Sequence, residues 1–200
     1  MTKKDGIRTM GRSKEEEYFR KREVQAIERL RKEEARKAER AAMGKIIDSQ
    51  DPKLLAKLED LGFNHETVKL LHLLPLVQTA WADNRVDPRE MALILDLSRE
   101  RGIMPGSPPE QLLSEWLRKR PADKLFRDGL ELISEILCSR PAEVRRKTTK
   151  EIVELCARVA AASGGLFGLG EKTSEEERRV INGLCERVDE PKGSAGPPPD

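Results

Sequence analysis

The feature that most constrains this chain of 200 residues is the run LLHLLPLV, from Leu70 to Val77, which is apolar on nearly every side of a helix. A helix at a protein surface shows one apolar stripe, whereas a helix that is apolar almost all round is buried by its neighbours. We therefore predict that a helix over residues 65–82 forms the centre of a helical bundle. Pro75 removes one backbone donor inside this helix, so we expect a kink near Leu71–Leu74.

The neighbouring helices are delimited by their start and stop residues. The pairs Asp51-Pro52, Asp87-Pro88 and Ser107-Pro108 each place a capping oxygen before a proline at the first helical position. Gly62 and Gly102 stand where helices should end. These signals and the apolar periodicity predict helices near residues 13–44, 51–61, 65–82, 87–101, 108–119, 122–139, 142–163 and 174–188.

Composition agrees with an all-α fold class. Four Phe, two Trp and one Tyr are too few aromatic residues for a sandwich or barrel, while Leu, Ala, Glu, Lys and Arg dominate. Charged residues make up 37%, so part of the chain buries little. We predict a disordered segment at 1–12, a charged extended helix at 13–44, a single multi-helix bundle of about seven helices at 50–189, and a disordered tail at 190–200.

Several functional classes are disfavoured by the sequence. No apolar run is long enough to span a bilayer, and the N-terminus lacks the apolar core of a secretory signal, so we expect a cytoplasmic protein. Acids interleave with bases, which is unlike the basic stripe of a nucleic-acid binder. Cys138, Cys156 and Cys185 have no Cys-x-x-Cys spacing and are interpreted as buried thiols. No catalytic arrangement is indicated, so we expect a protein that is not an enzyme.

An acidic turn follows the apolar helix, with the sequence ADNRVDPRE from Ala82 to Glu90. Asp83, Asp87 and Glu90 could offer hard oxygen ligands to Ca²⁺, Mg²⁺ or Mn²⁺. Asp87 and Glu90 also have the spacing of a capping box, in which both carboxylates satisfy the first amides of the next helix. The sequence leaves a divalent-cation site and a structural cap as alternatives; no other cofactor is predicted.

This turn resembles the hallmark of the tellurite-resistance TerB family, an Ala-Asp-Gly-x-Ile/Val-Ser/Asp-x-x-Glu turn between two helices. With the helix count, the resemblance covers residues 50–189. It implies an all-helical domain that binds divalent metal through the turn carboxylates and acts in stress-response complexes at the membrane. Asn84 stands where the family has glycine, and Asn tolerates a left-handed backbone better than most residues. Residues 155–181 follow the same plan as residues 76–94, and this internal repeat carries Ser163 where the first segment has Asp83.

The charged helix carries a narrow apolar stripe of Phe19, Val24, Ile27 and Leu30 on an otherwise ionic surface. Such a stripe is typical of a helix that docks on a protein partner. The heptad pattern weakens beyond Leu30, so a two-stranded coiled coil and a homodimer are compatible with the sequence without being required by it. We predict that the partner-binding residues are this stripe and the adjacent Tyr18.

The same helix is also similar to the inhibitory stretch of mitochondrial ATP-synthase inhibitor proteins. Those proteins carry a Tyr-Phe-Arg triplet followed by Leu-x-x-Leu-Lys-Lys, and here Tyr18-Phe19-Arg20 precedes IERLRK at residues 27–32. The sequence thus yields two expectations. The first is a non-enzymatic TerB-like interaction or stress-response module, with the cation site as an added possibility. The second is an ATPase inhibitor or adaptor that acts through the N-terminal helix.

Overall fold

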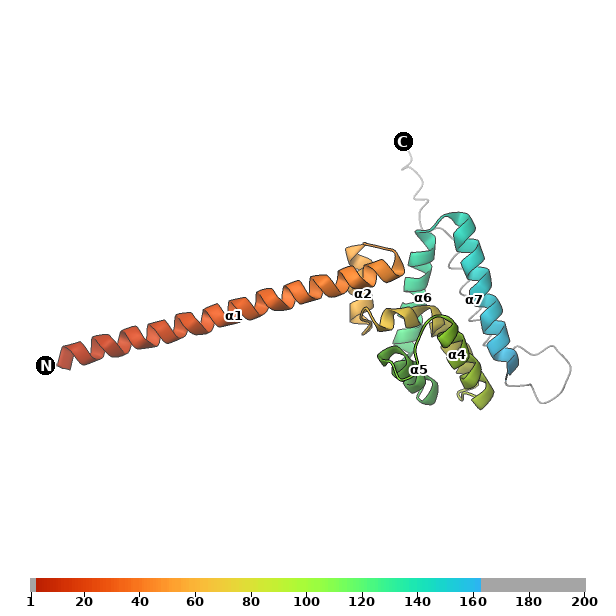
Figure 1. Ribbon diagram of the computed structural model, residues 1–200, viewed down its shortest axis with the longest axis horizontal. Coiled ribbons are helices and arrows are strands. Elements are labelled where there is room, and N and C mark those ends of the chain that lie inside the picture. Colours follow the sequence, from red (N-terminus) through yellow and green to blue (C-terminus); the bar gives the residue numbers. More distant parts are fainter. Residues whose placement is uncertain (1–2, 163–200) are drawn as a thin grey trace, which may run out of the picture. The chain divides into compact units, whose positions relative to one another are not determined.

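The computed structural model describes residues 3–162, with side chains from Phe19 onward, and the regular secondary structure in this part of the chain is all helical (Figure 1). It holds seven α-helices and one 3₁₀ helix and no strand, which confirms the all-α prediction. The elements are α1 (Lys3–Ile47), α2 (Pro52–Asp60), η1 (Thr67–Leu73), α3 (Leu74–Ala80), α4 (Pro88–Glu100), α5 (Pro108–Arg118), α6 (Asp123–Cys138) and α7 (Ala142–Ala162).

Some predictions lie outside the described residues. These are the helix at 174–188, the tail at 190–200, the predicted burial of Cys185, and the second segment of the internal repeat from Ser163 onward. At the other end of the chain, α1 begins at Lys3, well before the predicted start at residue 13. No proline precedes Pro52, so nothing in the sequence of this segment breaks the helix.

The chain divides into two compact units, residues 1–42 and residues 43–200. The last turn of α1 belongs to the second unit, where Met43 and Ile47 are buried in the core. Arg140, between α6 and α7, donates to the Ile47 carbonyl at 2.7 Å and pairs with Asp48. These contacts fix the end of α1 to the second unit.

The predicted start positions of three helices are confirmed, but the predicted capping oxygen of Ser107 is not, because the Ser107 hydroxyl donates to the Met104 carbonyl at 2.6 Å and makes no cap bond. The helices α2, α4 and α5 begin at Pro52, Pro88 and Pro108, and Asp51 caps α2 by accepting a hydrogen bond from the Lys53 amide at 2.9 Å. The predicted stops are confirmed as well, because Gly62 and Gly102 adopt φ values of +86° and +77°, a left-handed conformation that glycine takes without strain.

The apolar run from Leu70 to Val77 lies at the centre of the second unit, as predicted. Of its residues only His72 is exposed. The predicted single kinked helix is corrected, because the run is divided between η1, ending at Leu73, and α3, starting at Leu74. In a continuous α-helix the Pro75 ring would clash with the Leu71 carbonyl; here Pro75 instead occupies the first turn of a new helix, where its missing N–H costs nothing.

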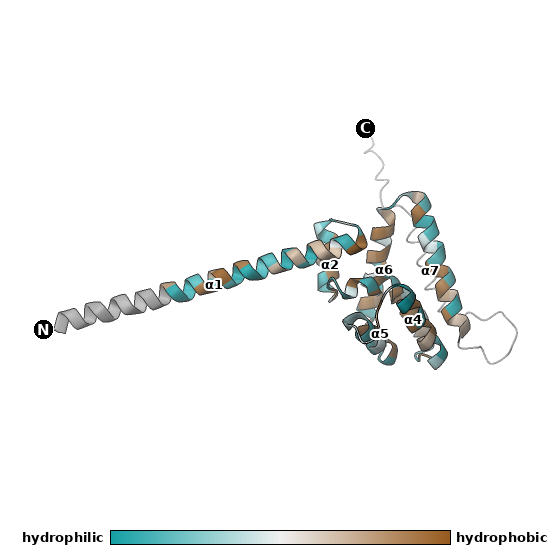
Figure 2. Ribbon diagram, in the orientation of Figure 1, coloured by the Kyte–Doolittle hydropathy of each residue, from teal (hydrophilic) through white to brown (hydrophobic). Residues whose placement is uncertain are grey.

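The remaining helices pack around this centre. α3 contacts α4, α5, α6, α7 and η1. α6 buries a long apolar face that runs from Phe126 to Leu137, and much of its ribbon is brown in Figure 2. Gly129 in α6 allows close approach to the centre, since a Cβ atom there would overlap Leu74 Cδ2. The absence of one side chain thus sets how tightly α6 packs.

Candidate functional site

The acidic turn joins α3 to α4 and contains a left-handed residue. Trp81 ends α3, and Asn84 has φ +59° at the position where the TerB pattern has glycine. Asn is among the few non-glycine residues that adopt this conformation readily, because its short polar side chain can bond locally. The turn therefore takes a left-handed backbone at Asn84 without requiring glycine there.

Hydrogen bonds in this turn form the predicted capping box. The Asp87 Oδ1 atom accepts from the Arg89 amide at 2.8 Å, and the Asp87 amide donates to Glu90 Oε2 at 2.9 Å. Glu90 is 5% exposed, so its carboxylate reaches the cap from a nearly buried position. The cap interpretation of Asp87 and Glu90 is thereby confirmed.

Trp81 anchors the turn on the bundle. Its indole Nε1 donates to the Trp116 carbonyl of α5 at 2.8 Å. The Trp116 ring meets Phe63 edge-on, with centroids 6.1 Å apart and an interplanar angle of 88°. This geometry suits the charge distribution of aromatic rings. The start of the acidic turn is thus held by a hydrogen bond to the backbone of Trp116, whose ring packs against Phe63.

Asp83, by contrast, is exposed at the tip of the turn. Within the described part of the chain, no three His, Cys, Asp or Glu side chains gather where they could hold a metal ion, and this includes Asp83, Asp87 and Glu90. Two of these three carboxylates bond the helix start instead. The divalent-cation site stays a prediction.

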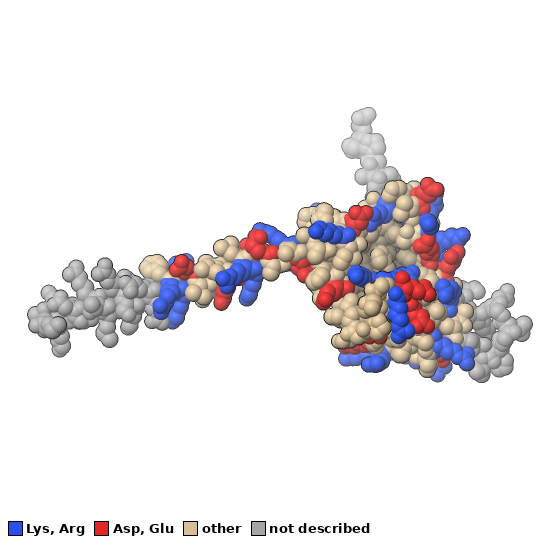
Figure 3. Space-filling model, in the orientation of Figure 1, with Lys and Arg blue, Asp and Glu red and all other residues tan. Residues whose placement is uncertain are grey.

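The stripe on α1 is the second candidate site, and its described side chains are open to solvent. Phe19 is 64% exposed, Val24 50%, Ile27 42% and Leu30 62%. The Tyr18 side chain lies outside the described residues. Acidic and basic side chains alternate along the described part of this helix (Figure 3). Large apolar groups on a strongly ionic helix are the arrangement of a docking surface.

Sequence reasoning missed a polar cavity of about 340 Å³ between α2 and α6, lined by Lys57, Asp60, Leu61, Lys124, Asp128, Glu131 and Leu132. Lys57 donates to Glu135 at 2.6 Å, which raises the pKa of Lys57. Hydrogen bonds from Lys124 and then from Arg127 lower the pKa of Asp128. The two lysines partly balance the three carboxylates of the lining, and because α2 and α6 lie far apart in the chain no local motif could reveal the cavity.

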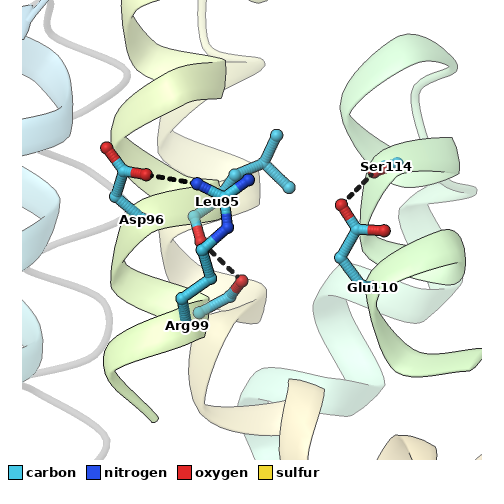
Figure 4. A network of polar contacts seen from close by, with 6 residues as sticks. Leu95, Asp96, Arg99, Glu110 and Ser114 are labelled. Atoms are coloured by element: carbon cyan, nitrogen blue, oxygen red, sulfur yellow. Dashed lines mark hydrogen bonds and ion pairs between the residues drawn. The ribbon is translucent and has the colours of Figure 1, made fainter. Parts of the chain in front are cut away.

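Polar contacts on α4 and α5 are local. Arg99 bonds Asp96 at 2.6 Å within α4, whereas Ser114 meets Glu110 at 3.5 Å within α5 (Figure 4). Both are pairs three or four residues apart, which stabilise the helix that carries them. These bonds pair polar side chains within each helix, and they form no shared site between α4 and α5.

The burial of the two described cysteines agrees with the prediction for one and differs for the other. Cys156 is buried on α7, as predicted, but Cys138 is exposed at the end of α6, so its predicted burial is wrong. Cys138 is the last residue of its helix, where the chain turns out of the core. Burial raises the pKa of Cys156 to about 11, against a hydrogen bond with Thr79 that lowers it.

Comparisons of this chain with known protein families, with curated proteins and with solved structures each found no match. Among the described helices, none combines the length and apolar character that crossing a membrane requires. Function is therefore inferred from the acidic turn and the exposed stripe themselves.

Proposed function

We propose that this chain is a non-enzymatic, TerB-like helical interaction module that binds a protein partner through the stripe on α1, defined here as Phe19, Val24, Ile27 and Leu30. The observation that carries the proposal is the exposure of all four side chains, from 42% to 64%, on a helix that is otherwise ionic. Burying such side chains against a partner gains roughly 1.5–3 kcal/mol each when burial is complete. Stress response is the role that the TerB resemblance implies.

The kinship with TerB is supported by the acidic turn. The turn joins two helices of an all-helical unit, takes a left-handed backbone at Asn84 and ends in the Asp87–Glu90 cap. Each of these features corresponds to a position of the family pattern. In this proposal the bundle is the scaffold that carries the docking helix.

The docking test uses the full chain as bait in an extract of its native host. Wild-type bait should recover its partner, whether another protein or an untagged copy, and Leu30→Glu should lose it because a charge replaces an apolar contact. Gln25→Glu is the matched control, since residue 25 lies on the opposite side of the helix. Equal recovery by all three baits would contradict docking through the stripe.

The exposure of Phe19 within Tyr18-Phe19-Arg20 favours a second candidate, an ATPase-inhibitor-like protein. The full chain should then slow ATP hydrolysis by a rotary synthase, and Phe19→Ala should relieve the inhibition. An inert full chain would eliminate this candidate while leaving the interaction module in place.

The cation prediction has its own test. Because Asp87 and Glu90 bond the helix start, we expect millimolar Ca²⁺, Mg²⁺ or Mn²⁺ to leave the melting temperature unchanged. The indole of Trp81, close to Asp83 in the chain, provides a fluorescence readout of the same titration. A rise in melting temperature that Asp83→Ala removes would instead establish a cation site at the turn.

A further inference from the structure

Charged residues lie beside the stripe on the same face of α1, and the order of their charges along the helix indicates which partner this face fits. Residues 20, 24, 27, 31 and 34 follow steps of four and three, so they lie on one side of the helix. Residues 23 and 30 lie on the same side, by the same steps from residue 27. This face therefore contains Arg20, Glu23, Arg31 and Glu34 beside the apolar residues. Glu34 also pairs with Lys37 of the same helix at 2.9 Å but stays exposed, so a partner must accommodate all four charges.

We propose that the partner is a second copy of this chain, with the two α1 helices antiparallel about a two-fold axis at Ile27. In this register, the residue numbers of two side chains that face each other across the interface add up to 54. Val24 then meets Leu30, and Ile27 meets Ile27 of the other copy. Phe19 meets Ala35, so a large side chain faces a small one. The inference rests on the proposed function, because it names the partner of the same stripe.

Charge complementarity selects this register. Arg20 meets Glu34 and Glu23 meets Arg31, and the two-fold axis repeats each pair, which gives four ion pairs of opposite sign. A parallel pair in register would instead place Arg20 against Arg20 and Glu34 against Glu34, and like charges across a helix interface disfavour association. If the antiparallel helices shifted so that the numbers of facing residues added up to 57, Arg20 would face Lys37 and Glu23 would face Glu34. Both of these pairs have like charges.

Every residue in this register lies in the first unit, and each is exposed to solvent. Val24, Ile27 and Leu30, at 42–62% exposed, fall in the middle of the paired segment, and the ion pairs flank them. An apolar centre with a polar rim is the usual anatomy of a protein interface.

The test measures the dimer dissociation constant of the full chain by sedimentation equilibrium. Arg20→Glu and Glu34→Arg should each raise it about tenfold, because each substitution turns two ion pairs into two repulsions. The double variant R20E/E34R should return it to within about threefold of wild type, since the pairs re-form with signs exchanged. Arg29→Glu, the same change on the opposite side of α1, is the matched control and should have little effect.

Proximity is tested separately with Ile27→Cys in a Cys138→Ser, Cys185→Ser background. The two-fold axis brings the two copies of residue 27 within reach of a disulfide, so mild oxidation should give a covalent dimer. Leu30→Cys in the same background should not cross-link, because its two copies are offset by six residues, about 9 Å along the axis.

A monomer at all concentrations would overturn the inference, and so would failure of R20E/E34R to restore association. Neither result affects docking of the stripe on another protein, which the host-extract experiment tests. Dimers that Leu30→Glu leaves intact would overturn both the register and the role of the stripe in dimerisation. The two proposals can therefore fail separately.

Discussion

At the scale of single residues, the carboxylates of the acidic turn hold a helix end in place. Asp87 and Glu90 each accept a backbone hydrogen bond, at 2.8 and 2.9 Å, and Glu90 does so from a buried position. An unsatisfied amide at a helix start costs free energy that such a cap recovers. The turn's acidic character thus has a structural cause that does not depend on any bound ion.

Replacing Asp87 with Ala should lower the free energy of unfolding by about 1 kcal/mol, because the Arg89 amide loses its acceptor. Glu90→Gln should cost less than Glu90→Ala, since Gln keeps an acceptor for the Asp87 amide. Urea unfolding followed by tryptophan fluorescence measures these differences. Asp83→Ala, at the exposed tip, is the control and should stay within about 0.5 kcal/mol of wild type.

Thiol reactivity gives a second prediction at this scale. With the Cys156 pKa raised to about 11, roughly one thiol in a thousand is thiolate at pH 8, and only the thiolate attacks a disulfide reagent. A C138S/C185S variant should therefore react with such a reagent only after unfolding. The C156S/C185S variant, which keeps the exposed Cys138, should react in the folded state. Fast labelling of native Cys156 would contradict its burial.

At the scale of helices, close packing depends on which side chains are absent. A Cβ atom at Gly129 would overlap Leu74 Cδ2, and Leu74 has no exposed surface. The buried Leu74 side chain has little room to move away, because protein interiors are close-packed. Gly129 thus sets the distance between α6 and the start of α3, although glycine inside a helix normally lowers its stability.

Gly129→Ala should lower the free energy of unfolding by about 1 kcal/mol. Overpacking against Leu74 costs about 1–3 kcal/mol, and the higher helix propensity of Ala offsets about 1 kcal/mol of that cost. In a Leu74→Ala background the same substitution should be neutral or stabilising, because the overlapping atom is gone. A thermodynamic cycle of the four chains, measured by urea unfolding, gives the coupling. Equal effects in both backgrounds would show that Gly129 does not limit the packing.

At the scale of the whole molecule, the boundary of the second unit falls inside α1. Met43 has no exposed surface and Ile47 is 3% exposed, both within the core. A chain starting at residue 43 should therefore be more stable than one starting at residue 48. The difference should be roughly 3 kcal/mol or more, since each fully buried apolar side chain contributes about 1.5–3 kcal/mol.

Thermal unfolding of the two truncated chains, followed by circular dichroism, measures this difference. A chain from residue 43 in which Ile46, which is 39% exposed, is changed to Ala serves as a control for loss of an apolar group at the same place. It should melt close to the chain that keeps Ile46. Identical melting of the chains from residues 43 and 48 would mean that the end of α1 contributes nothing to the core.

The sequence by itself determined the starts and ends of most helices in the second unit. Helix starts at Pro52, Pro88 and Pro108 and stops at Gly62 and Gly102 depend on local backbone chemistry, which neighbouring residues fully specify. Burial of the Leu70–Val77 run, apart from the exposed His72, followed from its apolar residues on nearly every side. The spacing of Asp87 and Glu90 allowed two interpretations, a capping box and a cation site, and the capping box was one of them.

Only the tertiary structure decided the features that depend on distant residues. The break between η1 and α3, the inclusion of Met43 and Ile47 in the core, and the polar cavity between α2 and α6 have no local signature. Each results from side chains that are far apart in the chain competing for the same space or the same hydrogen bond. Local patterns specify backbone conformation, whereas packing chooses among the faces and helix ends that those patterns leave open.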